Sequence, residues 1–145
     1  MGKAKLMVAL RDRGSVESLV TLAIQLAKSM DAEMVALHVV EVPAATPLEA
    51  GEEFLDHPGK EILAAARQVA KRFSAKLSTG LVHAREAGEA IVNEAKYRGV
   101  ELLIVGHRGA HASALSKLLL GSTAQYVAHH PPCRVLIQVP PPHAH

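Results

Sequence analysis

The stretch at residues 102–123, LLIVGHRGAHASALSKLLLGST, carries the clearest structural signal of the chain. It opens with four consecutive apolar residues, 102–105, which predict a buried strand, because a strand of a parallel sheet is covered on both faces. A helix-like apolar segment follows at 115–120. Small and hydroxyl-bearing residues come after each of these two elements: Gly106, Gly109, Gly121, Ser122 and Thr123.

These small residues have two interpretations. Glycine lets the backbone approach a ligand and point its N–H groups at an anion, and hydroxyl residues at a helix start add further donors, which together predict a phosphate site. Alternatively, Gly106 and Gly109 only turn the chain after a strand, and Ser122 only caps a helix. Two glycines are a weak signal for a ligand, so the residues alone favour the second interpretation.

Strand-like and helix-like segments alternate along the whole chain. Short apolar runs predict strands at 5–10, 33–42, 75–81, 101–105 and 133–139. Apolar residues at helical spacing predict helices at 15–30, 58–73, 85–98 and 115–130, with 43–57 as a mobile loop. Ser15 is expected to cap the first helix, Gly99 to end the third, and Gly121 to interrupt or cap the fourth. This alternation predicts an α/β fold, a doubly wound parallel five-stranded sheet with helices on both faces.

Composition narrows the class of protein. The 145 residues are 49% hydrophobic with a net charge of +2, which predicts one domain over 1–145, with 140–145 as a flexible tail. The chain has no Trp and only two Tyr and two Phe, which argues against a nucleic-acid surface built on stacking. It has no apolar run long enough for a membrane span and no leader pattern, so we expect a cytoplasmic protein. Cys133 is the single cysteine and is interpreted as a core residue.

The spacing Gly106-x2-Gly109, followed by Gly121-Ser122, resembles the nucleotide-loop signature of the universal stress protein family. The resemblance covers nearly the whole chain, including VALHVV at 35–40, AQYV at 124–127 and PCRVLI at 132–137. It implies the strand order 3-2-1-4-5. In such a sheet the ligand crevice lies beyond the carboxyl ends of the strands, where the order reverses, so the first and fourth strands would flank it.

The sequence departs from the family pattern at two places. Nucleotide-binding members usually have nine residues between the second and third glycines, whereas this chain has eleven, from Ala110 to Leu120. The two extra residues either change the phosphate pocket or form a surface insertion, since extra loop length costs little free energy. Members also usually carry an aspartate just after the first strand, where this chain has Arg11 followed by Asp12.

The resemblance implies an adenine nucleotide, ATP or AMP, as the ligand, with Mg²⁺ bound only through the nucleotide. The positions it implies for the base and ribose are Ala9, Leu10, Arg11, Asp12 and Val39. The positions it implies for the floor and the phosphates are Val105, Gly106, Arg108, Gly109, Gly121, Ser122 and Thr123. An arginine cannot accept a hydrogen bond from a ribose hydroxyl but can pair with a phosphate, so we expect altered nucleotide preference, towards AMP or a cyclic nucleotide.

The resemblance also suggests partners. Family members commonly form homodimers through the last strand, 133–139, which would be a sheet edge here; alternatively, the prolines at 140–142 guard that edge. The amino-acid sequence of the 43–57 loop resembles, more loosely, that of family domains associated with membrane transporters. The alternative function is therefore a nucleotide-free interaction module that regulates a transporter or another protein.

Catalytic and metal sites are not indicated. The nine histidines show no ligand spacing, and His129 and His130 are adjacent on a predicted helix, so they point in different directions. No nucleophile with a paired base is evident, so we expect a binding protein and not an enzyme. His38 lies in the middle of the second predicted strand, where a hydrogen-bonded core histidine is favoured over a ligand-facing one.

Overall fold

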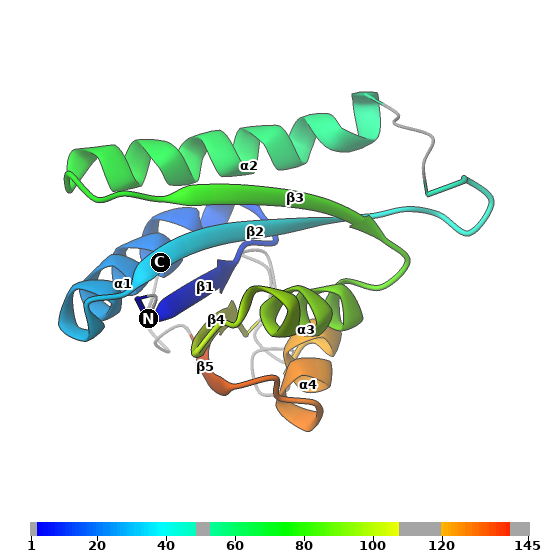
Figure 1. The fold of residues 1–145 in the computed structure, drawn as a ribbon. Helices are drawn as coiled ribbons and strands as arrows, with labels where there is room; N and C mark the ends of the chain where they lie inside the picture. Colours follow the sequence, from blue (N-terminus) through cyan, green and yellow to red (C-terminus); the bar gives the residue numbers. More distant parts are fainter. Residues whose placement is uncertain (1–2, 49–52, 108–119, 140–145) are drawn as a thin grey trace.

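The computed structural model describes residues 3–48, 53–107 and 120–139. A parallel sheet lies at its centre, made of β1 (Lys5–Ala9), β2 (Glu33–Glu41), β3 (Ser78–Ala84), β4 (Leu102–Gly106) and β5 (Arg134–Gln138). The strand order is β3-β2-β1-β4-β5, and all four pairings are parallel (Figure 1). The predicted fold class and strand order are confirmed.

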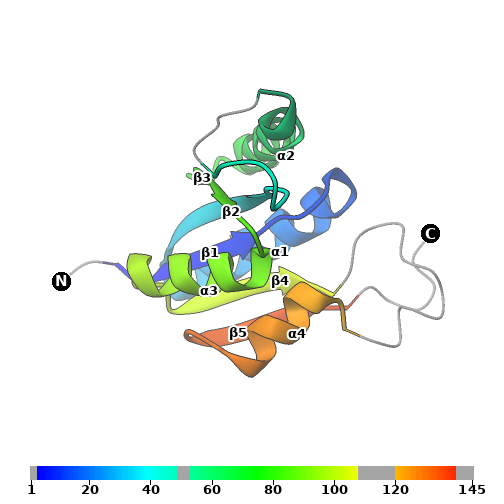
Figure 2. The same ribbon diagram turned by 90° about the vertical axis from the view of Figure 1, so that its right-hand side faces the viewer.

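Helices cover both faces of the sheet (Figure 2). They are α1 (Val16–Met30), which follows a short 3-10 helix η1 (Arg13–Ser15), α2 (Glu53–Arg72), α3 (Ala87–Arg98) and α4 (Ser122–His129). Because side chains alternate along a strand, β1 and β4 feed two cores. Leu6 and Ile104 pack with α1 and α2, whereas Met7 and Leu103 pack with α3 and α4, and all four are fully buried. No helix among the described residues is long and apolar enough to cross a membrane.

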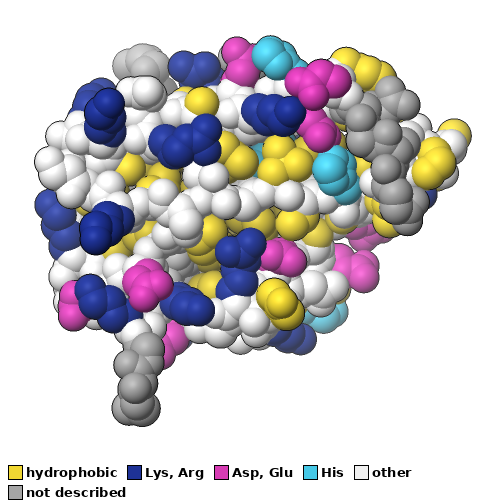
Figure 3. Space-filling view, turned by 45° about the horizontal axis from the view of Figure 1, so that its top comes forward, with side chains coloured by type: hydrophobic (Ala, Val, Ile, Leu, Met, Phe, Trp, Pro, Cys, Tyr) yellow, Lys and Arg dark blue, Asp and Glu magenta, His cyan; other side chains and the backbone are white. Residues whose placement is uncertain are grey.

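The two edge strands are less buried than the central ones. In β5 the side chains after Arg134 are half-buried, and in β3 those after Ser78 are half-buried. Figure 3 looks onto the β3 side of the molecule, where a band of hydrophobic side chains is bordered by Lys and Arg side chains on either side. Each edge therefore exposes apolar as well as polar surface.

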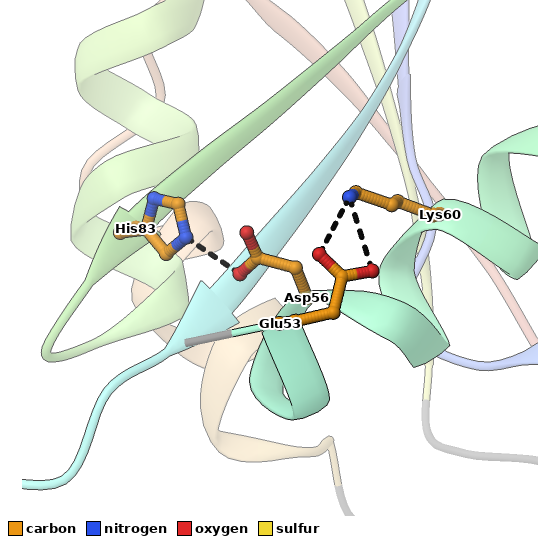
Figure 4. Close-up of polar contacts among 4 residues, drawn as sticks. All are labelled: Glu53, Asp56, Lys60 and His83. Atoms are coloured by element: carbon orange, nitrogen blue, oxygen red, sulfur yellow. Dashed lines mark hydrogen bonds and ion pairs between the residues drawn. The ribbon is translucent and has the colours of Figure 1, made fainter. Parts of the chain in front are cut away.

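Helix α2 begins at Glu53, earlier than the predicted start at Pro58, and Pro58 lies inside it. Two side-chain contacts stabilise the extra turn (Figure 4). Glu53 pairs with Lys60 at 3.1 Å, and Asp56 Oδ1 lies 2.7 Å from Nε2 of His83 on β3. Acidic residues in a first turn also suit the positive end of the helix dipole. The prediction was wrong because it placed Pro58 at the start of the helix. Proline is most common at that position, but here it lies inside the helix.

The predicted third strand, 75–81, is shifted by three residues. The first residues assigned to it close α2 instead: Ser74 adopts φ 52°, and Ala75 N–H donates to the Ala70 carbonyl at 2.9 Å. This is a Schellman ending, which satisfies carbonyls of the last helical turn. Gly99, with φ 68°, ends α3 in the same way, as predicted.

The other boundaries agree with the predictions to within two residues, except that Leu120 and Gly121, predicted as helical, precede α4, which begins at Ser122. Gly121 caps α4 in an extended conformation, and the predicted helical part at 115–119 lies outside the described residues, as does the predicted tail 140–145. Cys133 is half-buried just before β5, and burial raises the pKa of its thiol. The thiol is therefore a weak nucleophile at neutral pH.

The packing of α3 on α4 yields a test of the fold. A Cβ added at Gly88 would lie 2.8 Å from Cβ of Tyr126, which is too close to the backbone to move away by rotation of the side chain. We expect Gly88→Ala to lower the free energy of unfolding by about 1–3 kcal/mol, as overpacking does, although alanine favours a helix more than glycine. Chemical denaturation measures the change. Asn93→Ala, at an exposed position of α3, is the control, and equal stability of the two variants would contradict the packing.

Candidate functional site

A cavity of about 230 Å³ lies beyond the carboxyl ends of β1 and β4, where the strand order reverses. Strand ends and helix starts line it together. The described lining residues are Ala9, Leu10, Arg11, Asp12, Ser15, Leu19, Leu37, His38, Val39, Glu41, Ala87, Ile91, Val105, Gly106, His107, Gly121, Thr123 and Ala124. The location is the one at which doubly wound sheets bind their ligands.

Most of the residues singled out in the sequence meet at this cavity. They are Ala9, Leu10, Arg11, Asp12, Val39, Val105, Gly106, Gly121 and Thr123. Ser122 is exposed at the start of α4 and is absent from the described lining. Arg108 and Gly109 lie outside the described residues, as does most of the eleven-residue stretch between the glycines.

The loop after β1 is held by its own polar groups. Asp12 Oδ1 accepts a hydrogen bond from the Ser15 N–H at 3.0 Å, and Ser15 Oγ donates to the Asp12 carbonyl at 3.3 Å. Ser15 is the N-cap residue of α1, as predicted, but its hydroxyl is turned back to Asp12 and makes no capping hydrogen bond. The Asp12 carboxylate thus caps the N-terminus of η1, and the neighbouring Arg11 is exposed.

His38 fixes the position of Leu10. Its Nδ1 lies 2.8 Å from the Leu10 carbonyl, which can only accept, so Nδ1 carries the proton. The Leu10 N–H donates to the Leu37 carbonyl at 2.8 Å, so β2 holds Leu10 through both backbone groups. The two interpretations of His38 are therefore compatible, since the ring is half-buried and hydrogen-bonded and also lines the cavity. Gly59 of α2 packs on the ring, where a Cβ would lie 2.5 Å from Cδ2.

Two helices begin at the cavity, and their first turns differ. At α3, Glu41 Oε2 accepts a hydrogen bond from the Ala87 N–H at 2.9 Å, so a carboxylate already occupies this helix start. At α4, the cap residue is Gly121, which has no side chain of its own, and no side chain among the described residues caps the helix. Since a helix N-terminus carries partial positive charge, the α4 start attracts an anion, whereas Glu41 repels one from the α3 start.

His107 is a cavity residue that sequence reasoning missed. It is 4% exposed, and its Nδ1 has no hydrogen-bond partner among the described residues. Its backbone is well held, because its N–H donates to the Gln138 carbonyl and its carbonyl accepts from the Gly121 N–H. The sequence signal that could have identified His107 as a site residue is its position between Gly106 and Gly109.

The remaining missed residues are mostly apolar: Leu19, Leu37, Ala87, Ile91 and Ala124. Strand and helix periodicity marks such residues as core, and only the tertiary structure shows that they end at a cavity. The cavity thus combines apolar walls with an anion-attracting helix start, which suits a ligand with a flat apolar part and a negative group. Within the described ranges, His, Cys, Asp and Glu side chains form no group of three that could hold a metal ion.

Comparison with known proteins agrees with this architecture. A sequence model of the universal stress protein family matches residues 4–140. The chain is 34% identical to universal stress protein A homolog 2 of Coxiella burnetii, over 91% of this chain and 92% of that protein. It is 33% identical to a universal stress protein of Methanocaldococcus jannaschii, over 79% of this chain and 69% of that protein.

Solved structures share the fold at lower identity. A universal stress protein in complex with cAMP has a TM-score of 0.71 at 23% identity and covers 95% of this chain and 98% of its own. A universal stress protein of Archaeoglobus fulgidus in complex with dAMP has a TM-score of 0.73 at 16% identity, with 94% and 98% covered. A family protein of Arabidopsis thaliana with AMP bound has a TM-score of 0.66 at 17% identity, with 92% and 90% covered. By the family match and the two relatives, this chain belongs to the universal stress protein family.

Proposed function

We propose that the cavity binds an adenine nucleotide of the AMP type and that the protein is a cytoplasmic regulator without catalytic activity. The observation that carries the proposal is the start of α4 at the cavity, which no described side chain caps, whereas Glu41 already caps the start of α3. The structural relatives in complex with cAMP, dAMP and AMP support the ligand class.

The difference between the two helix starts determines the orientation of the ligand in the cavity. The phosphate lies at Gly121 and Thr123, where the amides of the first turn of α4 point to it. The base lies among the apolar residues of the opposite wall, including Val39 and Ile91, because a phosphate there would meet the Glu41 carboxylate. Arg11 is exposed at the rim and supplies a positive charge that attracts the anion from solution.

The size of the cavity favours a monophosphate. Its volume of about 230 Å³ is below the range of about 300–1,000 Å³ that holds drug-sized ligands. A monophosphate, linear or cyclic, is the smallest of the candidate nucleotides and is therefore the one that this volume accommodates most readily. We expect Mg²⁺ to bind only through the nucleotide, when the nucleotide carries a longer phosphate chain.

We also propose a homodimer through β5. Its described side chains Val135, Leu136 and Ile137 are half-buried in the single chain, and the strand is an edge of the sheet. Pairing with a second β5 would satisfy the outer backbone groups and cover these side chains.

A second candidate function is that of a docking module for a membrane transporter or another protein. Leu48, in the connection after β2, is 37% exposed, and Phe54, in the first turn of α2, is 70% exposed. Large apolar side chains in such positions are typical of contact surfaces. This function needs no ligand in the cavity.

Purification and calorimetry separate the two functions. We expect AMP and cAMP to release or absorb measurable heat on titration and ATP to bind more weakly. We also expect protein purified without added nucleotide to show a raised 260/280 nm absorbance ratio, because the chain has no Trp and only two Tyr. No heat with any of the three nucleotides, and an unliganded spectrum, would contradict the binding function and leave the docking module.

A charge placed at the α4 start tests where the phosphate lies. Thr123→Asp puts a carboxylate in the first turn of α4, which stabilises the helix by about 0.3–1 kcal/mol but repels a phosphate. We expect about a tenfold loss of AMP affinity, about 1.4 kcal/mol, with adenosine affinity unchanged. Gln125→Glu, exposed on α4 and absent from the described lining, is the control and should bind AMP normally. Equal losses for AMP and adenosine would show that the phosphate lies elsewhere.

A further inference from the structure

His107 has a fixed backbone beside the start of α4. Its N–H donates to the Gln138 carbonyl at 3.0 Å, and its carbonyl accepts from the Gly121 N–H at 3.1 Å. The first of these bonds continues the pairing of β4 with β5 one residue beyond Gly106↔Gln138. Because both backbone groups are bound, the direction in which the His107 side chain projects is fixed as well.

This side chain projects towards the face of the sheet that α3 and α4 cover (Figure 2). Side chains alternate along a strand, and Val105 packs with Ala124 and Val127 of α4 on this face. His107 comes two residues after Val105 and lies on the same face, since the strand pairing extends to it. It lines the cavity together with Thr123. The imidazole therefore lies between the end of β4 and the first turn of α4.

The imidazole of His107 has an unmet hydrogen-bonding group. The residue is 4% exposed, and its buried Nδ1 has no partner among the described residues. A proton on Nδ1 would be a buried donor without an acceptor, which proteins avoid more strictly than an unmet acceptor. The proton of the neutral ring therefore lies on Nε2, which makes Nε2 the donor. In the described part of the chain no group accepts a hydrogen bond from Nε2.

The first turn of α4 adds further donors beside this ring. The Gly121 N–H is taken by the His107 carbonyl, and the Gln125 N–H by the Gly121 carbonyl. The N–H groups of residues 122–124 lie between these two and have no carbonyl within the helix to bond to. The imidazole N–H and these amides are all donors, whereas a phosphate group offers acceptor oxygens and negative charge. The two sets are complementary.

We propose that His107 is a specificity-determining residue of the cavity, whose Nε2–H donates a hydrogen bond to the phosphate group of the bound nucleotide. This role rests on the proposed function, because it needs a ligand with its phosphate at the start of α4. It adds a side-chain donor to the backbone amides of the first turn. Only a ligand that brings an acceptor to the ring gains this hydrogen bond, so AMP gains it and adenosine does not.

Two substitutions separate hydrogen bonding by His107 from packing. His107→Leu fills a similar volume without a donor, whereas His107→Gln keeps an amide N–H that can take the place of Nε2–H. We expect His107→Leu to bind AMP about tenfold more weakly, as the loss of a hydrogen bond to a charged group predicts, with adenosine affinity unchanged. We expect His107→Gln to bind AMP more tightly than His107→Leu does. His129→Leu, exposed at the end of α4, is the matched control and should bind both ligands normally.

Calorimetric titration of these variants with AMP and adenosine gives distinct outcomes. Unchanged AMP affinity of His107→Leu would overturn the proposal, as would equal losses for AMP and adenosine or equal AMP affinities of the two His107 variants. Failure of the unchanged protein to bind AMP would contradict the proposed function, and this role of His107 with it. Normal AMP binding that does not depend on His107 would contradict the role of His107 alone.

Ring signals test the same contact in the unchanged protein. In protein labelled with ¹⁵N-histidine, the chemical shifts of the two ring nitrogens report which of them carries the proton and whether it is hydrogen-bonded. We expect saturating AMP to shift the Nε2 signal of His107, assigned through its backbone amide, and saturating adenosine to leave it unchanged. AMP binding without a change at His107, or an equal shift with adenosine, would overturn the proposal even where the variants are too unstable to titrate.

Discussion

The parallel pairing of β1 with β4 determines where the helices and the cavity lie. Leu6, Met7 and Val8 pair with Leu102, Leu103 and Ile104, all in the centre of the sheet. Because both strands run the same way and both end at the same edge, the turn after Ala9 and the turn after Gly106 must lie side by side. The helices that follow these strands lie on opposite faces of the sheet, and the cavity lies at the ends of the two strands, where Leu10 and His107 line it.

Polar contacts at this edge determine what the cavity can bind. Leu10 is held to β2 by His38 and Leu37, Asp12 by Ser15, and the start of α3 by Glu41. Among the described residues, no side chain caps the start of α4, and none is a partner for the buried Nδ1 of His107. These two features cost stability in the unliganded chain unless a ligand or water meets them, since an unsatisfied buried polar group costs about 1–3 kcal/mol. This is the pattern expected of a binding site.

The sequence was sufficient to predict the sheet order and most of the cavity lining, because the glycines, the strand runs and the family resemblance concern local segments. It failed where a distant contact decided the outcome. The start of α2 depends on His83, which lies on β3, and the hydroxyl of Ser15 turns to Asp12 instead of capping α1. Glu41 and His107 were missed because neither spacing nor composition shows that a strand end faces a helix start.

We propose that the negative group of the ligand lies at the start of α4 and not at that of α3. An amide-resolved NMR titration of the ¹⁵N-labelled protein with AMP, with adenosine as the reference ligand, tests it most directly. We expect the phosphate to shift the amides of Ser122, Thr123 and Ala124 most, relative to adenosine, because the Gly121 N–H already donates to the His107 carbonyl. Phosphate-dependent shifts centred on Ala87 and Gly88, with the amides of α4 unchanged, would contradict it.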